Sequence, residues 1–119
     1  MLRIVGAICL LCWPLRVTAQ AEDTAQILMM KCSGNPTGIV FTECRARISG
    51  IYDVMALNGL AEPSTFKQKM ASICNNGVSP TWNERVQVFV NWMNNHPERQ
   101  EDRDTLAVMA AERQIWPCR

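Results

Sequence analysis

Four cysteines constrain the fold of this chain more than any other feature of its sequence. They are Cys32, Cys44, Cys74 and Cys118, and two further cysteines lie within the first 12 residues. After residue 19 there is no Cys-x-x-Cys pair and only one histidine, so a zinc site is a poor interpretation. We therefore expect two disulfides, worth about 3 to 4 kcal/mol each by loop closure. We expect no metal and no other cofactor.

The N-terminus has the three parts of a secretory signal peptide. Arg3 precedes an apolar run at residues 4–13, and the sequence then reaches Pro14 and the small-residue ending Val17-Thr18-Ala19. The apolar run is shorter than the roughly 20 residues that span a bilayer. We predict a signal peptide at residues 1–19, cleaved after Ala19, and a single domain at residues 20–119. Export also fits disulfide formation.

Charge argues against a nucleic-acid or membrane partner for the exported domain. Cleavage removes Arg3 and Arg16, which leaves ten Lys and Arg against eleven Asp and Glu, a net charge of −1 with histidine neutral. A domain so balanced has no basic field to hold nucleic acid or anionic lipid. We expect neither kind of partner.

The apolar residues recur with a helical period almost throughout, which predicts an all-α domain. We expect a compact bundle of about four main helices plus a short connecting helix. The expected core-facing residues of the first two helices are Ala25, Leu28, Met29 and Cys32, followed by Cys44, Ile48, Ile51, Tyr52 and Met55. The second helix should end at Asn58-Gly59, with Leu60 folded back onto Met55.

The second half of the chain continues the helical pattern. Phe66, Met70 and Ile73 indicate the short helix, and Ser79-Pro80 is a typical start for the third main helix. That helix carries Trp82, Val86, Phe89, Val90 and Met93 on one face and should end near residue 95, before His96-Pro97. The last helix should bury Leu106, Met109 and Trp116 and stop at Pro117.

Helix geometry favours one of the three possible cysteine pairings. Two antiparallel helices joined at His96-Pro97 would bring the start of one beside the end of the other. Cys74 precedes the first and Cys118 follows the second, so these two can meet. Cys32 then pairs with Cys44 by exclusion. The other two connectivities remain formally possible.

Three segments together resemble a known family. Residues 44–53 read Cys-x5-Gly-x2-Asp, and residues 73–79 contain Cys-x-x-Gly-Val-Ser. Residues 86–99 read Val-x-Val-Phe-Val-x-Trp-x4-Pro-Glu-Arg, and Ala-x-x-Ala-Ala and Pro-Cys follow at 107–111 and 117–118. These motifs are similar to those of the Rap/Tai family, small exported helical immunity proteins associated with type VI secretion. Arg47 stands where this resemblance would lead us to expect an aromatic residue.

The resemblance implies a periplasmic protein without enzyme activity that neutralises a peptidoglycan-cleaving amidase effector, often as a dimer. We expect Phe66, Lys67 and Lys69, with the loop residues Asn75 and Asn76, to contact the effector. We expect Val88 and Trp92, which form a second apolar stripe, to lie on a face between two copies of the chain.

Catalytic interpretations of the same residues are weaker. His96 precedes a proline in a turn, where a capping or solvent-facing role is more common than general-base catalysis. The mixed charges at residues 98–104 are typical of a solvated first helical turn. No nucleophile motif occurs, so we expect no catalytic residue. Two alternatives remain open, namely a periplasmic chaperone or stress adaptor and a small secreted hydrolase.

Overall fold

The computed structural model describes residues 23–119, and within them the domain is helical. The expected signal peptide lies outside the described residues. The elements are α1 (Ala25–Cys32), α2 (Ile39–Leu60), α3 (Phe66–Met70), α4 (Trp82–Asn95), the 3-10 helix η1 (Pro97–Arg99) and α5 (Asp104–Ile115). The described part has no strand, only one isolated bridge between Thr24 and Arg103. The all-α prediction, with four main helices and a short connecting one, is confirmed.

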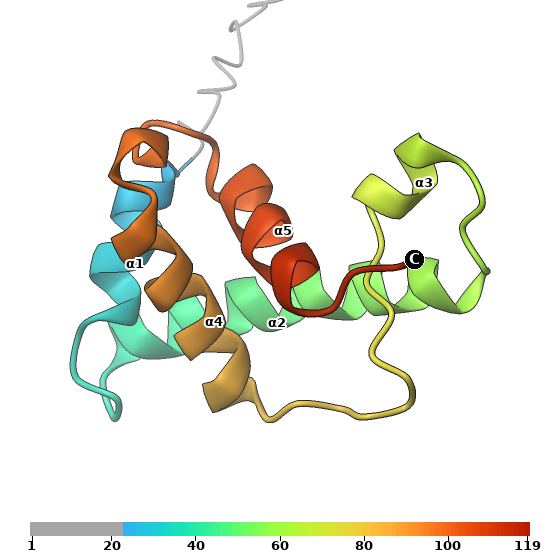
Figure 1. The fold of residues 1–119 in the computed structure, drawn as a ribbon. Coiled ribbons are helices and arrows are strands. Elements are labelled where there is room, and N and C mark those ends of the chain that lie inside the picture. The colour runs from blue at the N-terminus through green and yellow to red at the C-terminus, as the bar shows by residue number, and fades with distance from the viewer. Residues whose placement is uncertain (1–22) are drawn as a thin grey trace, which may run out of the picture.

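Four of the helices form a bundle, and the fifth stands apart from it. α1, α4 and α5 pack on the first half of the long helix α2, while α3 and its flanking segments lie beyond α5 near the other end (Figure 1). No helix among the described residues is both long enough and apolar enough to span a bilayer. Residues 61–80, which include α3, form a smaller lobe beside the bundle, and we call it the α3 lobe.

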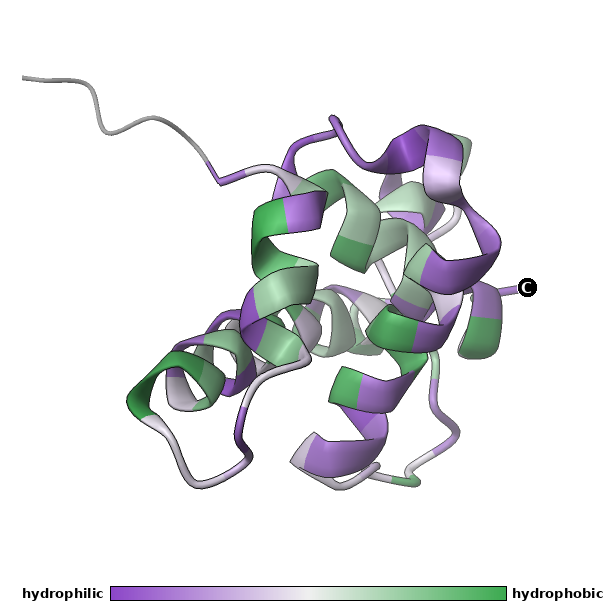
Figure 2. Cartoon of the chain, turned by 90° about the vertical axis from the view of Figure 1, so that its left-hand side faces the viewer, coloured by the Kyte–Doolittle hydropathy of each residue, from purple (hydrophilic) through white to green (hydrophobic). Residues whose placement is uncertain are grey.

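Two hydrophobic clusters match this division of the molecule. The larger one joins α1, α2, α4 and α5, and the helices around it carry both hydrophobic and hydrophilic residues (Figure 2). The smaller one consists of Tyr52, Met55 and Ile73, with Trp116 packed against it. The rings of Tyr52 and Trp116 meet edge to face, with centroids 5.4 Å apart. This second cluster fastens the α3 lobe to α2 and to the C-terminal tail.

Both predicted disulfides are present. Cys32 and Cys44, whose Cα atoms are 5.2 Å apart, join the end of α1 to α2. Cys74 and Cys118, with Cα atoms 4.8 Å apart, join the α3 lobe to the tail after α5. The backbone N–H of Cys74 also donates to the carbonyl of Trp116 at 3.0 Å, so a hydrogen bond and a disulfide both join these two segments of the chain.

The expected start of α4 at Ser79-Pro80 is wrong by two residues. Thr81 is the N-cap, and its hydroxyl accepts a hydrogen bond from the N–H of Glu84 at 3.2 Å. Glu84 in turn accepts from the N–H of Thr81 at 2.6 Å. This reciprocal capping box satisfies two otherwise unpaired donors, which a proline at the first position does not do. Trp82, expected in the core, is partly exposed and packs on Phe41.

The expected end of α2 at Asn58-Gly59 is also wrong, because the helix continues to Leu60. A Cβ on Gly59 would lie 1.9 Å from the carbonyl oxygen of Ile73. The glycine therefore permits close passage of the returning chain, and it is Glu62 that takes the left-handed conformation, with φ of 53°. Leu60 is exposed, and Ile73 rather than Leu60 packs on Met55.

α5 turns a different face to the core from the one expected. Leu106 is exposed, and Met109 and Trp116 are only half-buried. The buried residues of α5 are Asp104, Ala107, Val108, Ala111 and Glu112. Small alanine side chains let α5 approach its neighbours closely, and two carboxylates enter the interior with it.

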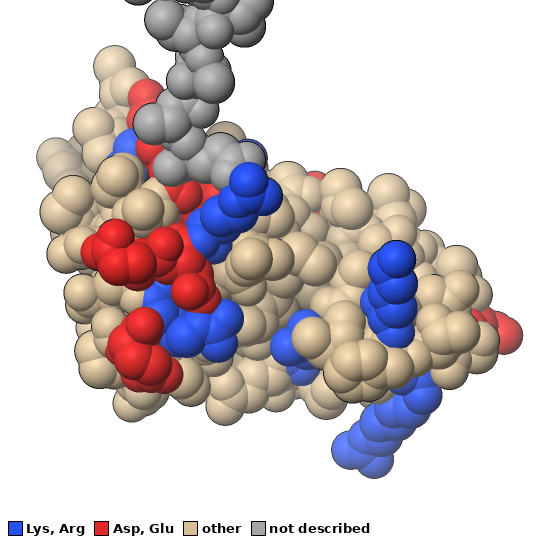
Figure 3. All heavy atoms as spheres, turned by 90° about the horizontal axis from the view of Figure 1, so that it is seen from above, with Lys and Arg blue, Asp and Glu red and all other residues tan. Residues whose placement is uncertain are grey.

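The face of the molecule seen from above has two halves that differ in charge (Figure 3). Seen from above, Asp and Glu gather with Lys and Arg over the half that holds α1 and η1 (Figure 3). The half that holds α3 shows Lys and Arg, with carboxylates only at its edges. The balanced net charge of the chain thus conceals an uneven distribution.

Candidate functional site

α3 is a short helix held in shape by its own side chains. The hydroxyl of Thr65 accepts from the N–H of Gln68 at 3.2 Å, and the Gln68 side chain accepts from the N–H of Thr65 at 3.1 Å. The Ser72 hydroxyl donates to the Gln68 carbonyl at 2.6 Å. None of the five residues of α3 is buried, and Phe66 is 79% exposed. Leu60 and Ile39 are exposed to the same degree, so Phe66 is distinguished by its place beside a groove rather than by its exposure.

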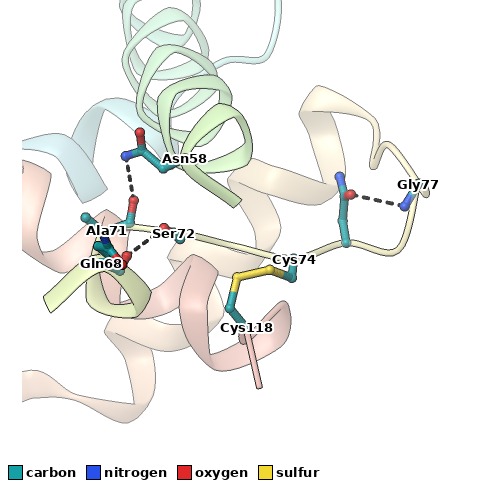
Figure 4. The surroundings of a disulfide bond; sticks show 8 residues. Asn58, Gln68, Ala71, Ser72, Cys74, Gly77 and Cys118 are labelled. Atoms are coloured by element: carbon teal, nitrogen blue, oxygen red, sulfur yellow. Dashed lines mark hydrogen bonds between the residues drawn. A yellow bond between two sulfur atoms is a disulfide. The ribbon is translucent and has the colours of Figure 1, made fainter. Parts of the chain in front are cut away.

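Several contacts fix the α3 lobe against the rest of the molecule. The Asn58 amide donates to the Ala71 carbonyl at 2.9 Å (Figure 4). The N–H of Ile73 donates to the Met55 carbonyl at 3.1 Å. Arg113 on α5 donates to the carbonyl of Met70 at 2.9 Å. With the Cys74–Cys118 disulfide, these contacts fix the backbone that carries Phe66 relative to the bundle. A preorganised surface loses less entropy when it binds.

A groove of about 480 Å³ separates α3 from the ends of α4 and α5. Phe66, Lys69 and Met70 form the wall on the α3 side. The facing wall includes Trp92, His96, Arg99 and Arg113, and the tail with the second disulfide closes one end. The structure thus brings Phe66 and Lys69 close to Trp92, although sequence reasoning placed them on two different faces. Lys67 points elsewhere, into a hollow of about 400 Å³ between α2 and α3.

Trp92 is mostly inside the molecule, with only 8% of its surface exposed. Its ring stacks on the ring of His96 at 4.2 Å between centroids, and the guanidinium of Arg99 lies 5.5 Å from its centre. Trp92 therefore offers little contact area of its own. Val88 is more accessible and lines a neighbouring hollow of about 280 Å³ together with the edge of Trp92.

His96 ends α4 and is held against the end of the helix. It is the C-cap residue, and its Nδ1 lies 2.8 Å from the carbonyl oxygen of Trp92. That contact and the stacking on Trp92 hold the imidazole ring against the helix end. Among residues 23–119, no three His, Cys, Asp or Glu side chains are placed to hold a metal ion.

The two loop asparagines have different roles. The amide of Asn75 donates to the Tyr52 hydroxyl at 2.8 Å, and its oxygen accepts from the N–H of Gly77 at 3.3 Å. Asn75 is thus part of the fold of the loop. Asn76 is exposed, with a left-handed φ of 53°, beside a hollow of about 450 Å³ that the C-terminal tail also lines. Of the pair, Asn76 is the one available to a partner.

Two buried carboxylates escaped sequence reasoning. Residues 98–104 were expected to be a solvated turn, but the side chain of Asp104 is only 4% exposed and pairs with Arg47. Burial alone would raise the pKa of Asp104, but the hydrogen bonds and charge of Arg47 and hydrogen bonds from Thr105 outweigh it and hold the pKa below its ordinary value. The sequence signal was the arginine at a position where an aromatic residue was expected.

Glu112 is buried without any such partner. It is 0% exposed, and neither carboxylate oxygen accepts a hydrogen bond. Burial raises the pKa of Glu112 to about 8, although the positive charge of Arg85 acts in the opposite direction. Glu112 continues the buried stripe of Ala107, Val108 and Ala111 at helical spacing, which is the signal that could have revealed it.

Comparison with known proteins adds one family. The family model for Rap1a immunity proteins matches residues 24–118, which include every helix of the structure. No curated protein and no solved structure matches the chain. The match covers the bundle, the α3 lobe and both disulfides, so it concerns the whole of the described fold.

Proposed function

The chain belongs to the Rap1a immunity protein family, and from this we propose that it is a periplasmic inhibitor of a peptidoglycan-cleaving amidase effector. The family assigns an immunity-type function with a protein effector as the partner. We propose further that the effector is delivered by type VI secretion. The chain would then protect the cell wall by covering the active site of the amidase, and the chemistry would belong to the partner.

The exposed ring of Phe66 is the observation that carries this proposal. Enzymes that cut a polymer hold it in a cleft, and a protruding aromatic residue on a rigid support is suited to fill one. Phe66 is 79% exposed on a helix with a complete capping box, and the lobe is tied to the bundle by a disulfide. Lys69 lines the same groove as Phe66, Lys67 lies on the same short helix beside a second hollow, and Asn76 lies on the same lobe. We propose that these residues contact the effector.

Inhibition of peptidoglycan hydrolysis tests the proposal. Candidate amidase effectors from the same genome would be assayed with an equimolar amount of the wild-type protein. Phe66→Asp should abolish inhibition, because it removes the aromatic anchor and adds a charge that the cleft must desolvate. Ile39→Asp is the matched control, since Ile39 is 81% exposed at the start of α2, away from the α3 lobe. Full inhibition by Phe66→Asp, or hydrolysis unaffected by wild type, would contradict the proposal.

A homodimer is the second part of the proposal, with the hollow beside Val88 and Trp92 as the contact between copies. Val88 is the better residue to probe, because an aspartate at the buried position 92 would disturb the core itself. Val88→Asp should halve the mass measured by light scattering, while its helical content stays unchanged. A wild-type monomer, or a variant of unchanged mass, would end the dimer proposal.

A further inference from the structure

The groove between α3 and the ends of α4 and α5 has an unusual distribution of charge. Its charged residues are Lys69, Arg99 and Arg113, and no aspartate or glutamate lines it. The chain as a whole has nearly equal numbers of acidic and basic residues, so a groove lined by cations alone departs from the average.

Within residues 23–119, two of these three cations are not paired with a carboxylate. Arg99 is paired with the carboxylate of Asp102. Neither Lys69 nor Arg113 forms an ion pair with any residue in the described part of the chain. Arg113 donates one hydrogen bond, to the carbonyl of Met70, which positions its guanidinium at the groove without removing its charge. The groove therefore holds two uncompensated positive charges.

Apolar and aromatic surface lies beside these charges. Phe66 stands on one side of the groove, and the stacked pair of Trp92 and His96 forms part of the other. A ligand must then present negative charge to the cations and apolar surface mainly to Phe66, because Trp92 is only 8% exposed. The volume of about 480 Å³ suits a few side chains of a peptide segment rather than a whole helix.

We infer that this groove receives an acidic segment of the partner protein, with carboxylates bound by Lys69 and Arg113. The inference rests on the proposed function for the identity of that partner as the effector. Guanidinium and ammonium groups bind carboxylates by charge-assisted hydrogen bonds, and an unopposed positive field also accelerates encounter with an acidic surface. The Lys and Arg side chains over the α3 half of the molecule extend this field beyond the groove (Figure 3).

Charge reversal at Lys69 tests the inference without disturbing the fold. Lys69 makes no side-chain contact that holds the lobe, whereas a change at Arg113 would break the bond to Met70. Lys69→Glu should slow association with the amidase effector about tenfold at low salt. At about 0.5 M salt the difference in association rate between variant and wild type should shrink, because salt screens the charges. Arg45→Glu, which makes the same charge change on an exposed part of α2 near Trp82, should stay within about twofold of wild type. Equal rates for wild type and Lys69→Glu would overturn the inference.

A second measurement separates this inference from the proposed function. Isotope-labelled full-length mature protein would be titrated with a hexaglutamate peptide, with hexalysine as the control. Hexaglutamate should shift the signals of Lys69, Arg113 and the Trp92 indole, and these shifts should be lost in Lys69→Glu. Shifts elsewhere, or none, would overturn the inference. If the groove binds the peptide while wild type fails to inhibit any amidase, only the proposed function fails.

Discussion

The guanidinium of Arg47 on α2 holds both carboxylate oxygens of Asp104, the first residue of α5, at 2.8 and 2.9 Å. A second hydrogen bond from Nη2 of Arg47 reaches the hydroxyl of Thr105 at 2.9 Å. The planar guanidinium suits such two-point binding, which a lysine would not reproduce. This contact joins two residues that are 57 positions apart in sequence, and it ties α2 to the first turn of α5.

Removal of Arg47 should destabilise the fold, because it leaves the buried carboxylate of Asp104 without its cation. Arg47→Ala should lower the free energy of unfolding by about 2 to 3 kcal/mol, below the range for fully buried pairs because Arg47 itself is half exposed. Urea denaturation at pH 7 measures this. The double variant Arg47→Met with Asp104→Leu should recover most of the loss, because no unpaired carboxylate remains. A single variant as stable as wild type would contradict the importance of this contact.

The Arg47–Asp104 contact should also make stability sensitive to acid. The pKa of Asp104 is below its ordinary value in the folded protein, so the folded state gives up this proton more readily than the unfolded state. The stabilisation is present above the unfolded pKa near 4 and is lost as pH falls through the lower folded value. Asp104→Asn should therefore flatten the decline in stability below pH 4. A variant that declines as steeply as wild type would contradict this origin.

Glu112 should have the opposite pH dependence. Its folded pKa is about 8 and its unfolded pKa 4.5, so the folded state retains a proton that the unfolded state loses. Stability is complete below pH 4.5 and falls as pH rises to 8, by up to about 5 kcal/mol. Glu112→Gln should remove this dependence. The free energy of unfolding of this variant, relative to that of wild type, should therefore be higher at pH 8 than at pH 5. Parallel losses in the two proteins between pH 5 and 8 would rule out Glu112 as the cause.

Two glycines of α2 provide a matched pair of substitutions. Gly59→Ala should destabilise by about 1 to 3 kcal/mol, since its Cβ would collide with backbone of Ile73 that cannot move aside cheaply. Gly50→Ala should stabilise by about 0.5 to 1 kcal/mol, because nothing lies within 4 Å of its Cβ and alanine favours the helix. Thermal unfolding of both variants checks the pair. Stabilisation by both substitutions would show that helix propensity, and not the approach of Ile73, decides the effect at Gly59.

The two disulfides should differ in what they hold. Cys74→Ser with Cys118→Ser should cost about 4 kcal/mol and Cys32→Ser with Cys44→Ser about 3, from loops of 44 and 12 residues. Only the first pair of changes should expose the amides of the α3 lobe to hydrogen exchange, because only that bond ties the lobe to the tail. Protection of those amides in the Cys74 and Cys118 variant would show that the small hydrophobic cluster suffices.

The fold was predictable from the sequence where local signals decide it. Apolar residues at helical spacing, with Gly and Pro between the helices, located the five α-helices but not the 3-10 helix η1. The bend at His96-Pro97 led to the cysteine pairing. Details that depend on a distant segment were not predictable. Gly59 has the sequence of a helix end, but its role is set by Ile73, 14 residues on. Arg47 stands where an aromatic residue was expected, but nothing in the sequence around Asp104 showed that the two would pair.

The contact residues were predictable in kind but not in arrangement. Phe66 and Lys69 were expected on one surface and Trp92 on another, because local sequence patterns do not show in which direction the chain turns after α2. The turn at Glu62 and the close passage at Gly59 bring α3 back towards the ends of α4 and α5, and only then does the groove exist. Cations far apart in sequence meet there for the same reason.

None of the five residues of α3 is buried, and the helix is held in shape by hydrogen bonds among Thr65, Gln68 and Ser72 rather than by packing on the bundle. Most substitutions at Phe66, Lys67 or Lys69 therefore cost the domain little stability. A lineage that carries this protein is free to vary those positions one at a time while the four-helix bundle stays intact. Neutral drift on this lobe supplies the raw material from which an inhibitor for a changed enzyme can be selected.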